Sequence, residues 1–290
     1  MTYQQKVRVT ALLFLLPTII GLLLFRLVPI GWAFALSFYE WQIFDKAEFV
    51  GLANYAHIIQ SPLAQKILWQ SVLYTLLYVP GALVLALVLA VVLNQSFRYS
   101  GFFRTAFFVP YITATVAITL AWRWMFSTRF GVINNALDFF GVDGPAWLAD
   151  PFWALPAVAL VSIWKDVGFY MLLLLAGLQT IDPTLYEAAR VDGARPVRRF
   201  FRITIPLLSR SLFFVLIIAL IRSSQTFEIT YALTSGGPNR ASTTLAFFIY
   251  ENAFIDFNMG YASALSYILC VALGLLTLVN FYFRKRWVHE

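Results

Sequence analysis

The stretch EAARVDGARPVRRFF, residues 187–201, holds four arginines, a glutamate and an aspartate between two long apolar runs. Such a density of charge is unusual here, because the 290-residue chain is 61% hydrophobic and only 12% charged, with a mean hydropathy of +0.77. A soluble domain of this length needs much more polar surface, whereas lipid requires apolar residues on the outside of a helix bundle as well as inside it. The composition therefore indicates a polytopic membrane protein.

Apolar runs long enough to cross the roughly 30 Å of membrane hydrocarbon as helix, about 20 residues each, occur repeatedly in the chain. Six such runs lie near residues 11–36, 69–93, 106–126, 152–177, 207–232 and 261–283. They are continuously apolar and do not alternate as the strands of a membrane barrel do. The sequence therefore predicts an all-α protein with six transmembrane helices in one domain, residues 1–290.

The distribution of lysine and arginine predicts the orientation of these helices. Of the 21 basic residues, 13 fall on segments that share a side with the N-terminus, four fall on the other side, and four lie within or at the edges of spans. Basic residues concentrate on the cytoplasmic side of membrane proteins. We therefore expect both termini in the cytoplasm, and this bias explains the net charge of +7 without a nucleic-acid partner.

The residues that most often carry chemistry are scarce. The chain has a single cysteine, Cys270, and two histidines, neither of them in an apolar run, so we expect no disulfide, metal site or histidine-based catalytic triad. No phosphate-binding G-x-x-x-x-G-K-[ST] loop is present. We predict that the chain is not an enzyme and binds no cofactor, and that any energy from ATP comes from another subunit.

The charged stretch itself predicts a short helical hairpin. Asp182 and Pro183 suit the cap and first position of a helix, and Gly193 suits the left-handed residue that ends one. Pro196 then starts a second helix, which we expect Pro206 to break at the membrane. Such a hairpin is either an amphipathic loop held against anionic lipid or a docking element for a cytoplasmic partner.

A pattern of small and apolar residues favours docking. Glu187-Ala188-Ala189 is followed after three residues by Gly193, then after nine by Ile203, and then by Ile205-Pro206. This resembles the EAA loop of permease subunits of binding-protein-dependent ABC importers, with isoleucine at 205 where leucine is usual. Four other segments resemble the carbohydrate-uptake branch, which includes maltose-, lactose- and glycerol-3-phosphate-type permeases: FVGLANY (49–55), FFRTAFFVP (102–110), LAGLQTIDPTLYEAARVDGA (175–194) and YALTSGGP (231–238).

The resemblance implies a six-span first permease subunit with the type I importer fold, in a bacterial or archaeal inner membrane. It implies four kinds of partner: a second permease subunit in a heterodimer, two ATPase subunits that bind ATP and Mg²⁺, an extracytoplasmic solute-binding protein, and lipid. The coupling loop, 178–206, would contact an ATPase through Glu187, Ala188, Ala189, Asp192, Gly193, Ile203 and Pro206. By the same resemblance, Gly236, Gly237 and Pro238 would lie where the binding protein docks.

Polar residues inside apolar runs are candidates for the transport path, because a charge within the membrane is costly and usually faces protein or water. The candidates are Trp164, Lys165, Asp166, Tyr170, Arg222, Gln225 and Glu228. Planar polar groups bind sugar hydroxyls, and aromatic rings stack on the C–H face of a sugar. A structural alternative is that Lys165 and Asp166 simply neutralise each other.

We therefore predict a permease subunit that moves a sugar or sugar-like solute by alternating access. Two alternatives remain: a stand-alone secondary carrier, and an importer of glycerol phosphodiester or glycerol-3-phosphate. A monosaccharide, a disaccharide and an amino sugar are all compatible with these residues.

Overall fold

The computed structural model describes residues 3–42, 46–95 and 98–287, which are mostly helical and include one two-stranded ribbon. The chain divides into two compact units, Met1–Ser61 with Ile249–Ile268, and Pro62–Phe248 with Leu269–Glu290. The last helix, α14 (Met259–Trp287), contributes residues to both units. The single domain that we expected over residues 1–290 stays a prediction.

The first unit contains helices and a short antiparallel ribbon tied together by polar side chains. Its elements are α1 (Tyr3–Leu22), the π-helical turn η1 (Leu23–Leu27), α2 (Val28–Leu36), β1 (Tyr39–Glu40), β2 (Glu48–Phe49), α3 (Ala53–Gln60) and η3 (Glu251–Ile255). The Asn54 amide donates to the carbonyl oxygens of Ser37 and Tyr39, at 3.0 and 2.9 Å. These bonds satisfy backbone groups where the chain leaves α2 for β1.

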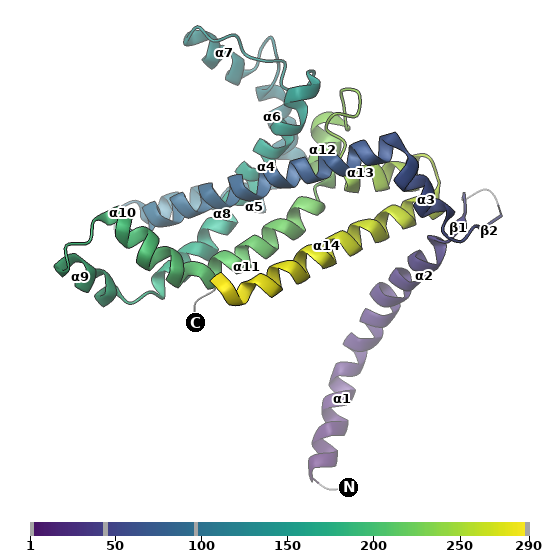
Figure 1. Ribbon diagram of the computed structural model, residues 1–290, viewed down its shortest axis with the longest axis horizontal. Coiled ribbons are helices and arrows are strands. Elements are labelled where there is room, and N and C mark those ends of the chain that lie inside the picture. Colours follow the sequence, from purple (N-terminus) through teal and green to yellow (C-terminus); the bar gives the residue numbers. More distant parts are fainter. Residues whose placement is uncertain (1–2, 43–45, 96–97, 288–290) are drawn as a thin grey trace. The chain divides into compact units, whose positions relative to one another are not determined.

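The second unit is a helix bundle built around α8. Its elements are α4 (Pro62–Leu93), α5 (Ser100–Ile112), α6 (Thr115–Met125), α7 (Val132–Phe139), α8 (Pro151–Gln179), α9 (Pro183–Val191), α10 (Pro196–Arg199), the π-helical turn η2 (Phe200–Thr204), α11 (Ile205–Ser224), α12 (Phe227–Thr234) and most of α13 (Leu245–Tyr250). Helices α4, α5 and α11 all pack against α8 (Figure 1). Two-thirds of the most apolar window of α8, 67%, is buried.

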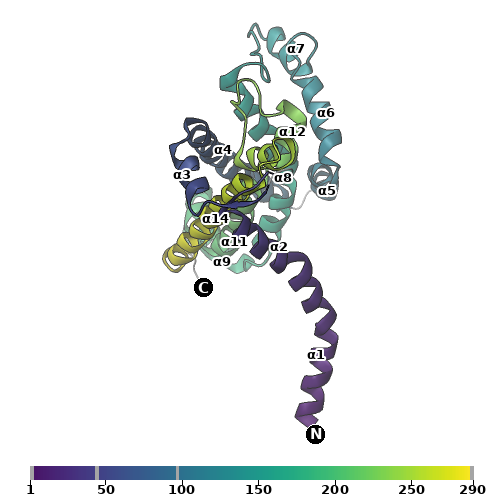
Figure 2. The same ribbon diagram turned by 90° about the vertical axis from the view of Figure 1, so that its right-hand side faces the viewer.

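Among the described residues, five helical stretches are long and apolar enough to cross a membrane. They are Thr10–Leu36, Pro62–Leu93, Pro151–Gln179, Pro196–Ser224 and Met259–Phe283. Helices α5 and α6 make a sixth span only when they are counted together, since they are bent by 100° (Figure 2).

The span expected near 106–126 is therefore a bent pair of helices and not one continuous helix. Helix α5 ends at Ile112; the next residue, Thr113, has an extended backbone (φ −77°, ψ 145°), and its hydroxyl donates to the carbonyl oxygen of Val109 at 2.8 Å. Threonine readily makes such local side-chain bonds to the backbone, and these compete with continued helix.

The fifth apolar run also differs from expectation. Pro206 does not end the helix that Pro196 begins; the helix continues through η2 into α11 and stops at Ser224. Proline lacks an N–H and its ring collides with the carbonyl four residues earlier. In the π turn before Pro206, the Ile205 N–H donates to the carbonyl oxygen of Phe200. This turn widens the helix and relieves that collision.

Helices α8 and α5 pack closely together at Gly168. A Cβ on Gly168 would lie 1.8 Å from the carbonyl oxygen of Phe107, which is backbone and has no room to give. Small residues allow membrane helices to pack this closely.

We expect Gly168→Ala to push α5 away from α8 and to destabilise the protein by about 1–3 kcal/mol. The midpoint of thermal aggregation in detergent, followed by size-exclusion chromatography, measures this loss. Gly274→Ala is the control, because a Cβ there meets nothing within 4 Å. Equal midpoints for the two variants would contradict the close contact.

Candidate functional site

A polar cavity of about 320 Å³ lies within the helix bundle of the second unit. Helices α4, α6, α8, α11 and α12 contribute its lining: Tyr74, Thr115, Ser162, Lys165, Asp166, Arg222, Gln225, Thr226, Phe227, Glu228 and Ile229. Five of the seven path residues expected from the sequence are in this set. The cavity therefore gathers four charged side chains inside segments that are otherwise apolar.

The break between α11 and α12 gives the cavity part of its polar lining. Helix α11 ends at Ser224; the next residue, Gln225, has φ −100° and ψ 17°, and the Phe227 N–H donates to the Gln225 carbonyl at 2.8 Å. Glu228 follows in the first turn of α12 and is exposed, as is Gln225. The residues at the break thus give the cavity lining an amide and a carboxylate.

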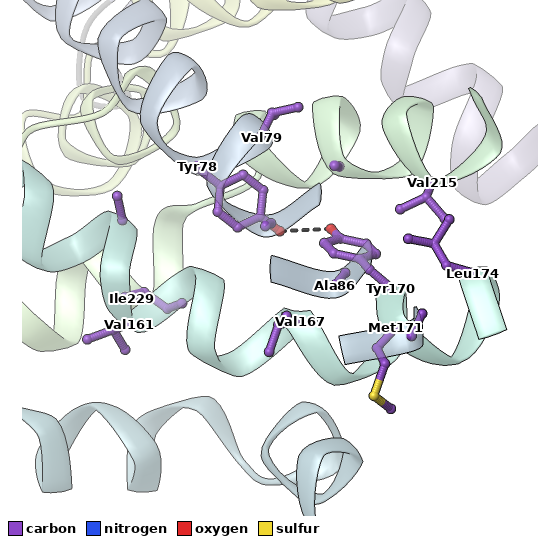
Figure 3. Packing of buried hydrophobic residues seen from close by; sticks show 14 of the residues in the cluster. Tyr78, Val79, Ala86, Val161, Val167, Tyr170, Met171, Leu174, Val215 and Ile229 are labelled. Carbon is purple, nitrogen blue, oxygen red and sulfur yellow. Dashed lines mark hydrogen bonds between the residues drawn. The ribbon is translucent and has the colours of Figure 1, made fainter. Parts of the chain in front are cut away.

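A hydrogen-bond chain links α8 to α4 beside the cavity. Tyr78 donates its hydroxyl to Oδ2 of Asp166 at 2.6 Å and lies 2.8 Å from the hydroxyl of Tyr170. Figure 3 shows the two tyrosine hydroxyls facing each other within the apolar cluster. Asp166 is 8% exposed, Tyr78 1% and Tyr170 0%, so Tyr78 supplies a buried carboxylate oxygen with a hydrogen-bond donor from protein.

Lys165 and Arg222 both turn toward Tyr111 on α5. Lys165 Nζ donates to the Tyr111 carbonyl at 3.4 Å, and Arg222 Nη2 donates to the Tyr111 hydroxyl at 2.9 Å. The two cations lie 5.6 and 5.5 Å from the centroid of the Tyr111 ring, within cation–π range. The hydrogen bonds of Lys165 and Asp166 thus go to different residues, Tyr111 and Tyr78, although the two charges still interact electrostatically; the mutual neutralisation of the pair stays a prediction.

Two of the expected path residues lie away from the cavity. Tyr170 is fully buried in the hydrogen-bond chain, as its position four residues after Asp166 on the same helix face allows. Trp164 is 41% exposed, packs edge-on against Trp122 at 5.4 Å and borders apolar grooves with Leu160 and Ile163. Adjacent helix positions point in different directions, which is why Trp164 and Lys165 separate.

Three tyrosines were missed by the sequence analysis. Tyr74 lines the cavity, Tyr78 binds Asp166, and Tyr111 receives both cations. Tyr74 and Tyr78 stack at 5.7 Å with planes 7° apart, four residues apart on α4. That spacing of two polar tips on one face of an apolar helix could have marked Tyr74 and Tyr78 as candidates, although not their partners.

The second region of interest is the hairpin of α9 and α10. Asp182 accepts from the Thr184 N–H at 2.9 Å, as predicted for a helix cap, and this bond lowers the pKa of the carboxyl. Gly193 has φ +73°. Its N–H donates to the Arg190 carbonyl oxygen at 3.0 Å, and the Ala194 N–H donates to the Ala189 carbonyl oxygen at 2.9 Å. These two bonds form a Schellman motif, so the expected left-handed ending is confirmed.

Most motif residues of the hairpin are accessible. Glu187, Ala188, Asp192 and Gly193 are exposed, whereas Ala189, Ile203 and Pro206 are half-buried. The contact of these residues with an ATPase stays a prediction.

The loop after α12 is held by hydrogen bonds between its own residues. Gly236 has φ +76°, and a Cβ on it would lie 2.6 Å from Oγ1 of Thr243. Ser242 donates to the Gly237 carbonyl at 2.6 Å, and the next peptide bond, to Pro238, is cis. The role of Gly236, Gly237 and Pro238 in docking a binding protein stays a prediction.

Comparison with known proteins gives the family. Residues 66–286 match the family model described as the binding-protein-dependent transport system inner membrane component. The chain belongs to this family. The permease is thus the membrane component of an ABC importer, a translocation subunit and not an enzyme, and a stand-alone carrier is not favoured.

Its relatives and its fold agree with this assignment. It is 39% identical to the sulfoquinovosyl glycerol transport system permease protein SmoG of Agrobacterium fabrum, over 90% of this chain and 86% of the relative. It is 35% identical to the lactose transport system permease protein LacF of Rhizobium radiobacter, over 93% and 92%. A solved bacterial alginate ABC transporter, in complex with an alginate pentasaccharide-bound periplasmic protein, superposes with a TM-score of 0.82 at 24% identity, over 99% and 98%. The fold expected from the sequence is confirmed.

We expect Tyr78→Phe to destabilise the permease by about 1–3 kcal/mol, because Asp166 loses the hydroxyl that satisfies its buried carboxylate. Tyr170→Phe is the matched control, since it removes a bond between two neutral hydroxyls and should cost less. Thermal unfolding in detergent measures both. Adding Asp166→Asn should recover part of the Tyr78→Phe loss; losses of equal size with no recovery would contradict this role.

Proposed function

We propose that the permease forms the path by which an ATP-driven importer moves a sugar or sugar-like solute across the inner membrane. The polar cavity carries this proposal. Intramembrane charges are retained at functional sites because they are costly elsewhere. The volume of the polar cavity, about 320 Å³, is at the small end of the roughly 300–1,000 Å³ typical of ligand pockets, so the cavity suits one or two sugar rings.

The chemistry of the lining supports this class of solute. The amide of Gln225 and the carboxylate of Glu228 can bind hydroxyl groups, and the rings of Tyr74 and Phe227 can pack on C–H groups. Relatives are named for transport of sulfoquinovosyl glycerol, lactose and sn-glycerol-3-phosphate. A glycerol-3-phosphate or glycerol phosphodiester importer is the alternative within the same family.

The hairpin supplies a way to couple transport to ATP. Ala188 offers a small exposed surface that a partner can approach closely, and Glu187 can pair with a basic residue. A Cβ on Gly193 would meet nothing within 4 Å, so the turn itself is open to a partner. We propose that this surface docks on one of two separate ATPase subunits, which bind ATP and Mg²⁺, while its arginines contact lipid headgroups.

The complete importer then needs three further kinds of protein. A second permease closes the path as a heterodimer, the ATPases close on ATP and move the hairpins, and an extracytoplasmic binding protein delivers the solute. The family description supports the binding protein. In this arrangement the hairpin and both termini are cytoplasmic, and the cavity opens to one side of the membrane at a time.

We expect the tagged permease to co-purify with an ATPase and a second permease. We also expect Glu187→Lys to uncouple transport from ATP hydrolysis. Uptake in reconstituted vesicles should fall at least about tenfold while insertion is unchanged, because the loss of a charge-assisted contact costs about 1.5–3 kcal/mol. Asp138→Lys makes the same change of charge on α7 and should remain coupled. Purification of the permease alone, or normal ATP-driven uptake by Glu187→Lys, would contradict the proposal.

A further inference from the structure

We propose that the transported solute carries an anionic group, a carboxylate, sulfonate or phosphate, and that Lys165 and Arg222 bind it in the cavity beside Tyr111. The inference rests on the proposed function, because it names the substrate class of the same cavity.

The first observation is that two cations from different helices converge on one neutral residue. Lys165 on α8 and Arg222 on α11 both donate to oxygen atoms of Tyr111, at 3.4 and 2.9 Å, and both lie within 5.6 Å of its ring centroid. Lysine offers three N–H donors and arginine five. One carbonyl and one hydroxyl oxygen therefore satisfy only a part of this donor set.

The second observation concerns the two carboxylates of the cavity. Asp166 accepts a hydrogen bond of 2.6 Å from Tyr78 and is 8% exposed, and its carboxylate also interacts electrostatically with Lys165 and Arg222. Glu228 lies on α12, beyond the helix break at Gln225, and is exposed. Near Tyr111 the lining therefore holds two cations and one buried carboxylate, which leaves one positive charge to be balanced there.

The energetics favour an anion at Tyr111. Two like charges within reach of the same ring repel each other, and inside a membrane protein this repulsion is weakly screened. The carboxylate of Asp166 offsets one of these charges, and an oxyanion between the cations compensates the other. The guanidinium of Arg222 matches the oxygens of a carboxylate, sulfonate or phosphate in a fork, and the ammonium of Lys165 adds a point charge.

The test is uptake by the complete importer, purified with its partners and reconstituted with its binding protein, of three matched pairs of probes. These are glucose and glucuronate, glucose and sulfoquinovose, and glycerol and glycerol-3-phosphate. We expect an anionic member to be imported, with its neutral counterpart at least about tenfold slower, because one unmade bond to a charged group costs about 1.5–3 kcal/mol. The pairs separate a carboxylate, a sulfonate and a phosphate.

Variants then assign the preference to the cavity. Arg222→Gln should reduce uptake of the anionic probe at least about tenfold, while Arg222→Lys should retain part of it by keeping the charge. Arg210→Gln is the control, because Arg210 is an exposed cation of the same helix outside the cavity. The amount of assembled importer in the membrane, measured for each variant, separates a binding defect from a folding defect.

Three results would overturn the inference: faster import of a neutral member, import of no anionic member, or unchanged anion uptake by Arg222→Gln. Neutral uptake that still depends on ATP and on Glu187 would leave the proposed function standing while the inference fails. Uptake that needs neither ATP nor Glu187 would remove the proposed function itself.

Discussion

A carboxylate within a membrane-spanning helix has to be satisfied by protein or by water. In α8 that carboxylate is Asp166, and its partner is the hydroxyl of Tyr78 on α4, which in turn meets Tyr170. The bond fixes the rotation of α4 relative to α8. It also brings Tyr74, one turn away on α4, to the cavity wall, so packing and the polar site depend on the same contact.

Two interruptions of the transmembrane helices also border the cavity. Helix α5 ends at Ile112, and Thr115 at the start of α6 lines the cavity; α11 ends at Ser224, and the next residue, Gln225, lines it too. Interrupted helices free backbone groups at membrane depth, which is tolerated where they face protein or a polar cavity. Gly168 also positions the site, because it lets α5 pack closely against α8 at Phe107. Tyr111, one turn further along α5, then reaches Lys165 and Arg222.

Local sequence signals predicted local structure well. Asp182, Gly193 and the apolar runs follow rules that involve only neighbouring residues, and the structure bears out the cap and the left-handed turn. The predicted helix end at Pro206 was wrong because a π turn before the proline, which no residue type specifies, relieves its steric clash. Tyr78 and Tyr111 could not be assigned, because their partners lie 88 and 111 residues away along the chain.

In the proposed mechanism, solute passes through the cavity between α8 and the α11–α12 break, which opens to each side of the membrane in turn. Replacement of Cys270, the chain's single cysteine, by serine allows Gln225→Cys to be the one reactive thiol. Its rate of reaction with a membrane-impermeant thiol reagent, measured from each side of reconstituted vesicles with and without ATP, tests this alternation directly. We predict reaction from one side without ATP, reaction from the other side with ATP trapped, and protection by transported solute. A thiol that reacts from neither side, or from the same side in both states, would contradict it.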